Sequence, residues 1–154
     1  MTDQRAQTRY MMTMSATFEA PLVIAGGPCG MRRILHVTSG RFEGDSLRGI
    51  IMPHGADWVL TRPDGVHQLD IRFTLRTDDD ELIYMTSSGL FVIDPEKQAA
   101  IRNGQSVPRT DYYFRTAIFF ETGARAYSWM NRVLAIGIGT RTQTGMETEV
   151  LQLA

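Results

Sequence analysis

Apolar and polar residues alternate along much of the chain, in short runs that turn residues separate. The clearest run covers residues 66–77. One of its faces carries Leu69, Ile71, Phe73 and Leu75, and the other carries Gln68, Asp70, Arg72, Thr74 and Arg76. Because successive side chains of a strand point to opposite faces, this pattern predicts a strand with one buried face.

Comparable runs recur from residue 18 to the end of the chain. They predict strands at 18–24, 31–37, 49–52, 56–61, 66–77, 82–91, 112–121, 133–142 and 147–153. One segment differs, because Asp94 suits a helix N-cap and Pro95 suits the first helical position, which predicts a short helix near 94–102. We expect residues 1–15 to form a flexible N-terminal arm and residues 16–154 to form one domain.

Eight to ten short strands without intervening helices predict an all-β fold. A sandwich and a closed antiparallel up-and-down barrel both satisfy this pattern. Turns of two to five residues favour sequential hairpins, and therefore a lipocalin-like (calycin-like) barrel. A closed eight-stranded barrel has an interior that can hold one small ligand.

Composition narrows the functional classes. The net charge is −1 and no basic block recurs among the 154 residues, so we expect no nucleic-acid partner. No apolar run approaches the ~20 residues of a membrane helix, so we expect no membrane partner. A single cysteine, Cys29, and no signal-peptide pattern favour a cytoplasmic location. Lys97 is the only lysine among 16 basic residues, so an internal cation is expected to be arginine.

The polar face of residues 66–77 has two interpretations. The simpler one is a surface in contact with water. In the other, the polar face lines the barrel, and Asp70, Arg72, Arg115 and Glu121 form an internal network of paired charges. The direction of this face therefore decides whether it is a functional site.

The histidines and glycines offer weaker signals. His54 and Asp57 are three residues apart and form a candidate acid–base pair. The alternative is that His54 is a loop histidine that only caps a turn. None of the three histidines has the spacing of a metal-binding pair, so we expect no metal site. Gly137 and Gly139 alternate within a predicted strand, which indicates close packing rather than a nucleotide site.

A series of motifs then gives a resemblance. They are Gly40-Arg41-Phe42-Glu43-Gly44, Pro53-His54-Gly55-Ala56-Asp57-Trp58, Leu69-Asp70-Ile71-Arg72, Tyr113-Phe114-Arg115, Phe119-Phe120-Glu121-Thr122 and Tyr127-Ser128-Trp129-Met130-Asn131. Their order from residue 18 onward resembles the family called domain of unknown function 3237. The resemblance implies a lipocalin-like barrel, a homodimer or higher homo-oligomer, and no settled reaction. His54 and Asp80 stand where the family usually has glycine.

These observations lead to one functional hypothesis with two alternatives. We expect a barrel enzyme without a cofactor that moves a proton on an apolar, oxygenated metabolite, as an isomerase, cyclase, dehydratase or lyase. The candidate catalytic residues are Asp57, Asp70, Arg72, Arg115 and His54. The candidate substrate-binding residues are Trp58, Phe73, Tyr113, Glu121, Trp129 and Asn131. The alternatives are a non-catalytic binding or carrier protein, and a charge network that only stiffens the barrel.

Overall fold

The computed structural model describes residues 5–154, which form ten strands, one α-helix and two 3-10 helices. The strands are β1 (Thr8–Phe18), β2 (Leu22–Gly27), β3 (Gly30–Glu43), β4 (Arg48–Ile51), β5 (Ala56–Thr61), β6 (His67–Thr77), β7 (Leu82–Val92), β8 (Tyr113–Glu121), β9 (Ala135–Arg141) and β10 (Gly145–Leu153). The helices are α1 (Pro95–Arg102), η1 (Arg109–Asp111) and η2 (Arg125–Arg132). The helix predicted near 94–102 is thus confirmed.

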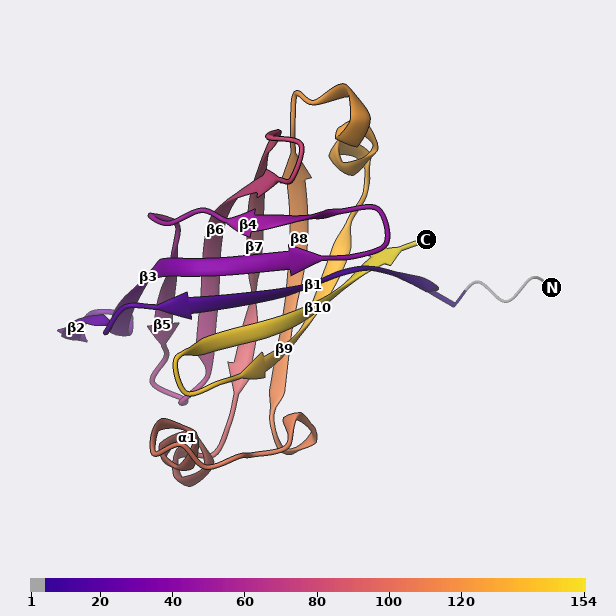
Figure 1. Ribbon diagram of the computed structural model, residues 1–154. Helices are drawn as coiled ribbons and strands as arrows, with labels where there is room; N and C mark the ends of the chain where they lie inside the picture. The colour runs from indigo at the N-terminus through magenta and orange to yellow at the C-terminus, as the bar shows by residue number, and fades with distance from the viewer. Residues whose placement is uncertain (1–4) are drawn as a thin grey trace.

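The strands close into an eight-stranded antiparallel barrel (Figure 1). Around the barrel the order is β1, β3, β4 together with β5, β6, β7, β8, β9 and β10. β4 and β5 share one place, since both pair with β3 on one side and with β6 on the other. β1 closes the barrel between β10 and β3. The predicted barrel is confirmed, and the sandwich is not.

The N-terminal segment is a correction to the expected flexible arm. Residues 8–18 form β1, which pairs with β10 along nearly its whole length. Met12, Met14 and Ala16 point into the core and are at most 5% exposed. A register shift between Tyr10 and Met12 breaks the alternation at the start of the strand, and pairing with the last strand holds the segment in place. Of the rest of the predicted arm, residues 5–7 are exposed and belong to no strand, and residues 1–4 lie outside the described part.

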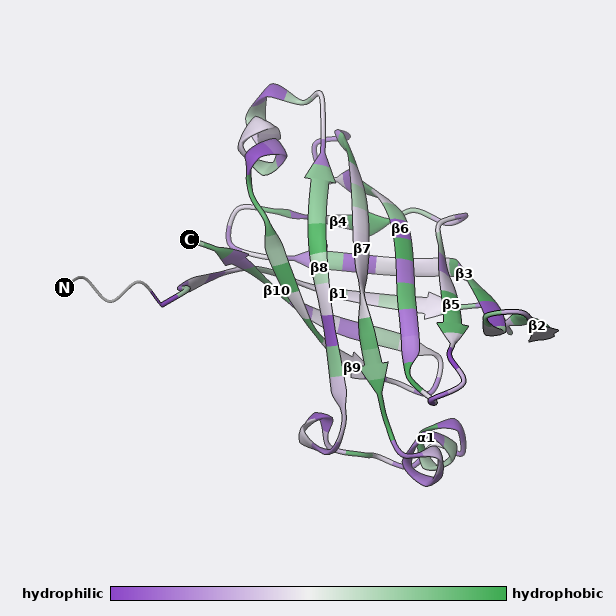
Figure 2. Cartoon of the chain, turned by 180° about the vertical axis from the view of Figure 1, so that it is seen from behind, coloured by the Kyte–Doolittle hydropathy of each residue, from purple (hydrophilic) through white to green (hydrophobic). Residues whose placement is uncertain are grey.

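The apolar face of β6 points inward and its polar face points to solvent. Leu69, Ile71 and Leu75 are nearly fully buried, whereas the side chains of Asp70 and Arg72 are more than half exposed. Figure 2 shows this alternation as hydrophilic and hydrophobic bands along β6. The interpretation of this face as a lining of the barrel was therefore wrong.

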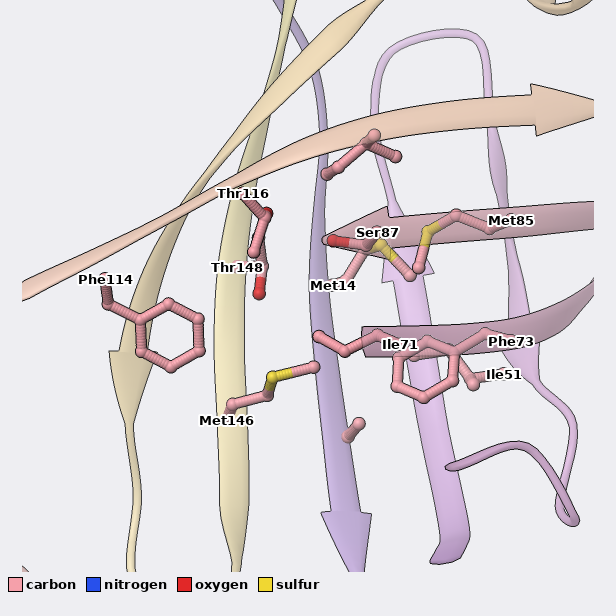
Figure 3. A pocket seen from close by; sticks show the side chains of 12 residues that line it. Met14, Ile51, Ile71, Phe73, Met85, Ser87, Phe114, Thr116, Met146 and Thr148 are labelled. Atoms are coloured by element: carbon pink, nitrogen blue, oxygen red, sulfur yellow. The ribbon is translucent and has the colours of Figure 1, made fainter. Parts of the chain in front are cut away.

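Side chains fill the middle of the barrel. Met14, Ile51, Ile71, Phe73 and Met85 converge there from four strands (Figure 3). They leave a cavity of about 10 Å³, roughly the space of a single water. The middle therefore does not hold a ligand, and the open space lies at one end.

Two glycines of β9 make this close packing possible. A Cβ atom at Gly139 would overlap the ring of Phe114, and one at Gly137 would overlap the side chain of Thr116. Both neighbours lie on β8. The close packing that the sequence indicated is confirmed.

Candidate functional site

α1 lies across one end of the barrel (Figure 1), and polar side chains gather beside it. Arg33 of β3, Asp57 of β5, Gln98 of α1 and Arg141 at the end of β9 line a cavity of about 30 Å³. This volume is enough for one or two waters. The remaining lining is mostly apolar: Phe18, Leu35, Val59, Leu69, Phe91, Phe114 and Met146. A small polar group is thus set in an apolar surrounding.

Asp57 points into the barrel because β5 alternates. Asp57 and Val59 are buried, whereas Trp58 between them is only half-buried. The Asp57 carboxylate is 6% exposed and accepts a hydrogen bond from the backbone N–H of Asp70 at 3.1 Å. Burial raises the pKa of Asp57 to about 7, although this hydrogen bond, Arg141 and Arg33 act in the opposite direction. Near neutral pH this acid is poised both to give and to accept a proton.

Two arginines accompany Asp57. Burial lowers the pKa of both Arg33 and Arg141, and the charge of Asp57 raises it. The charge of Arg33 lowers the pKa of Arg141 further, and the charge of Arg102 lowers the pKa of both arginines. The Nε of Arg33 is buried without a hydrogen-bond partner in residues 5–154. Arg141 donates a hydrogen bond to the carbonyl of Gly145 at 3.1 Å. These donors are thus only partly occupied within the protein.

His67 completes the polar end as a neutral group. Its Nδ1 lies 2.7 Å from the hydroxyl of Thr61, and Arg33 donates to the same nitrogen at 3.4 Å. Burial and the charge of Arg33 lower the pKa of His67 to about 4. Its ring also lies 5.6 Å, centroid to centroid, from that of Phe91. The histidine therefore stays uncharged at neutral pH and helps hold Arg33.

The small cavity adjoins a wider opening of about 490 Å³. The two share Phe18, Arg33, Leu35 and Arg141, so the opening leads toward Asp57. A volume of this size lies within the usual range of small-molecule pockets. We call this opening, together with the small cavity, the barrel mouth.

The structure separates the residues that the sequence proposed as a site. Asp57 alone lies at the mouth. Phe73 also points inward but is packed in the middle of the barrel. Asp70 and Arg72 form an exposed ion pair on the outer face at 3.8 Å. The expected internal network is therefore absent from the described residues.

The other candidates lie outside the barrel as well. Tyr113 and Glu121 are exposed on β8, and the guanidinium of Arg115 lies over the Tyr113 ring at 5.4 Å. Trp129 and Asn131 belong to η2 at the opposite end, where Asn131 bonds the backbone of residue 122 through both its amide atoms.

The two candidates near Asp57 in sequence also lie away from the mouth. Trp58 points away from Asp57 because neighbouring side chains on a strand alternate. His54 occupies an exposed turn with φ of 81° and lines neither the small cavity nor the opening. The predicted His54–Asp57 pair is therefore not formed.

Four residues at the mouth were not predicted from the sequence: Arg33, His67, Gln98 and Arg141. A signal existed for two of them. Arg33 shares the face of β3 that carries Leu35 and Val37, and Arg141 shares the face of β9 that carries Gly139. A charged residue on a face that is otherwise buried indicates an internal polar site. Gln98 lies on a helix and carried no such signal.

Residues 5–154 contain no group of three or more His, Cys, Asp or Glu side chains placed to share a metal ion. Within the same range, no helix has the length and apolarity needed to cross a membrane.

Comparison with known proteins supports the barrel architecture. A family model described as protein of unknown function (DUF3237) matches residues 6–153. A conserved protein of unknown function from Rhodopseudomonas palustris is 27% identical, with a TM-score of 0.88 over 97% of this chain and 98% of that one. A beta-barrel like protein from Acinetobacter baumannii is 32% identical, with a TM-score of 0.84 over 97% of each chain.

A more distant structure shares the fold alone. It is described as an enzyme from Penicillium herquei and has a TM-score of 0.75 at 16% identity. The match covers 100% of this chain and 98% of that one.

Proposed function

This chain belongs to the DUF3237 family, and we propose that it is a small-molecule barrel enzyme in which Asp57 transfers a proton at the barrel mouth. The observation that carries this proposal is a buried acid with a pKa of about 7, next to two arginines at a cavity that widens to about 490 Å³. The distant enzyme from Penicillium herquei is consistent with catalysis on this fold.

The chemistry follows from the charges at the mouth. The Asp57 carboxylate removes a proton from a carbon next to a substrate carbonyl, and the C–H electron pair forms an enolate. Arg33 or Arg141 donates hydrogen bonds to the enolate oxygen and stabilises its negative charge. In a substrate with a C=C bond conjugated to the enolate, protonated Asp57 returns the proton to the far carbon of that system and the double bond shifts, which isomerises the substrate. In a β-hydroxy ketone it gives the proton to the hydroxyl group instead; the C–O bond breaks, water leaves, and the enolate electrons form a C=C bond.

A non-catalytic carrier is the second candidate function. It is favoured by the small inner cavity, because about 30 Å³ next to Asp57 excludes all but the edge of a substrate. A ligand held in the wider opening would then contact the arginines without reaching the acid. The two functions share a binding site and differ only in whether a substrate atom meets the Asp57 carboxylate.

Hydrogen–deuterium exchange in D₂O distinguishes these functions. Protein is incubated with aromatic ketones and β-hydroxy ketones, and loss of the proton next to the carbonyl is followed by NMR. We expect exchange with the wild type and a decrease of about 10²- to 10⁴-fold in Asp57→Asn. Asp70→Asn makes the same chemical change on the outer face and serves as the matched control.

The outcomes separate clearly. Equal exchange rates in Asp57→Asn and the wild type would remove Asp57 from the reaction. Equal losses in Asp57→Asn and Asp70→Asn would point to a general effect on folding. A ligand that shifts the resonances of mouth residues without any exchange would instead favour the carrier.

A further inference from the structure

Three arginines from three different elements meet at the barrel mouth. Arg33 comes from β3, Arg102 is the last residue of α1, and Arg141 ends β9. All three line the opening of about 490 Å³. None of them forms an ion pair with a carboxylate within residues 5–154. The opening therefore concentrates guanidinium groups that form no ion pair with a carboxylate in the described part of the chain.

The three charges repel one another. The charge of Arg102 lowers the pKa of both Arg33 and Arg141, and the charge of Arg33 also lowers the pKa of Arg141. Like charges brought together cost stability unless an anion offsets them. Such an arrangement is favourable only when the site is occupied by a negative group.

The carboxylates nearby do not offset the three cations. Glu19 lines the same opening, but its side chain is exposed and forms no ion pair in the described residues. Asp57 faces the arginines from the inner side, and its pKa of about 7 leaves it only partly ionised at neutral pH. The opening keeps an excess of positive charge.

Apart from the arginines and the polar residues Glu19, Gln143 and Thr144, the opening is lined by apolar residues. Phe18, Pro21, Val23, Met31 and Leu35 line it beside the arginines. Val23, which belongs to β2, is 54% exposed. An anion as small as chloride would leave this apolar wall in water, whereas a molecule with an apolar body would cover it.

We propose that the barrel mouth binds an organic acid, with its carboxylate on the guanidinium groups of Arg33, Arg102 and Arg141 and its apolar body against Phe18 and its neighbours. This inference deepens the proposed function and rests on the mouth being its binding site. A guanidinium holds a carboxylate through two parallel hydrogen bonds.

A carboxylate suits the site better than a phosphate. Phosphate groups are typically bound by backbone N–H groups at the start of a helix. Here α1 presents its C-terminal end, where Arg102 lies, and this end carries partial negative charge. A singly charged carboxylate is therefore repelled less than a doubly charged phosphate.

Binding of a carboxylate has a second consequence at Asp57. The charges that act on this acid are those of Arg33, Arg141 and Asp70, and the first two favour its ionised form. A bound carboxylate neutralises part of that attraction and brings a like charge near. We therefore expect the protein to take up a fraction of a proton when a carboxylate binds near pH 7.

Calorimetric titration with paired probes tests the inference. Benzoate, 3-phenylpropanoate and octanoate are each compared with the corresponding amide, which has nearly the same shape and no charge. For at least one pair we expect the carboxylate to bind about tenfold or more tightly, as charge-assisted hydrogen bonds imply. Arg102→Gln should reduce this ratio severalfold. Arg125→Gln removes the same charge from η2 at the opposite end and should leave the ratio unchanged.

Each other outcome overturns the inference. If no carboxylate binds more tightly than its amide, the mouth is not a site for acids. If Arg125→Gln lowers the ratio as much as Arg102→Gln, the preference comes from net charge alone. If phenyl phosphate binds more tightly than every carboxylate, the head group is assigned wrongly.

Failure of this inference is distinguishable from failure of the proposed function. If Asp57→Asn loses hydrogen–deuterium exchange while acids and amides bind equally well, Asp57 remains catalytic and the binding of an organic acid is refuted. If carboxylates bind more tightly than amides but neither the wild type nor any variant catalyses exchange, the binding of an organic acid is supported and catalysis by Asp57 is refuted. Proton uptake is measured by repeating the titration in buffers with different ionisation enthalpies, and it should disappear in Asp57→Asn.

Discussion

Replacing Asp57 with asparagine should change how the stability of the protein depends on pH. The folded state raises the pKa of this acid from 3.8 to about 7, so it binds more protons than the unfolded state between these values. The contribution of Asp57 to stability is therefore fully present below pH 3.8 and is lost as the pH rises through 7.

The size of the effect follows from the shift. Each pH unit within this window costs about 1.4 kcal/mol of unfolding free energy, so a shift of roughly three units amounts to about 4 kcal/mol. Asparagine keeps an oxygen that accepts the hydrogen bond from the Asp70 backbone but does not ionise. The stability of Asp57→Asn relative to the wild type should thus increase by about 4 kcal/mol between pH 4 and pH 7.5.

His67 contributes with the opposite sign. Its pKa falls from 6.5 to about 4 on folding, so its contribution to stability rises with pH over that range. The wild-type curve will therefore look flatter than either term alone. Both proteins contain His67, so the difference between the Asp57→Asn and wild-type curves isolates Asp57.

Urea unfolding followed by tryptophan fluorescence at several pH values measures this difference. Asp70→Asn is the control and should give a curve parallel to the wild type, because Asp70 is exposed on the outer face. A difference between Asp57→Asn and the wild type that stays constant within about 1 kcal/mol would show that burial does not raise the pKa of Asp57.

Three further predictions concern the barrel itself. Gly139→Ala should lower the unfolding free energy, measured by urea unfolding, by about 1–3 kcal/mol, because the added methyl group overlaps a facing phenylalanine ring. Gly123→Ala is the control, since its Cβ would meet no atom within 4 Å, and an equal effect of both substitutions would contradict the prediction. A double-mutant cycle on Asp70 and Arg72 should give a coupling below about 1 kcal/mol, since the pair is exposed, and a larger value would indicate an unrecognised role. His54→Gly should raise the unfolding free energy by up to about 1 kcal/mol by relieving a positive φ, which thermal unfolding tests and a clear decrease would refute.

The sequence predicted the barrel better than the site. Alternation along residues 66–77 and the hairpin turns on either side sufficed for antiparallel strands, because each strand buries one face. The first strand was missed, since a register shift between Tyr10 and Met12 interrupts its alternation and the strand gains its partners only when the barrel closes. A pattern confined to one segment carries no information about such distant pairing.

The site was harder to predict because it takes one side chain from each of several strands. Asp57 was recognised through the motif around it, but Arg33 and Arg141 lie far apart in sequence. The direction of Asp70 and Arg72 was ambiguous for a related reason. Alternation shows that the two faces of a strand differ in polarity, but the packing of neighbouring strands decides which face points into the barrel.

The closure of the barrel by β1 has a consequence for assembly. β1 can pair with β3 early, but its other edge stays open until β10 has been made, and Ala154 finally donates a hydrogen bond to the carbonyl of Gln7 at 2.9 Å. Contacts between opposite ends of a chain form slowly, so an exposed edge persists on the ribosome and during refolding. Joining these two neighbouring ends by a short linker, and opening the chain at the exposed turn around Asp64, would turn the last contact into a local hairpin. Such a circular permutant should refold faster and aggregate less.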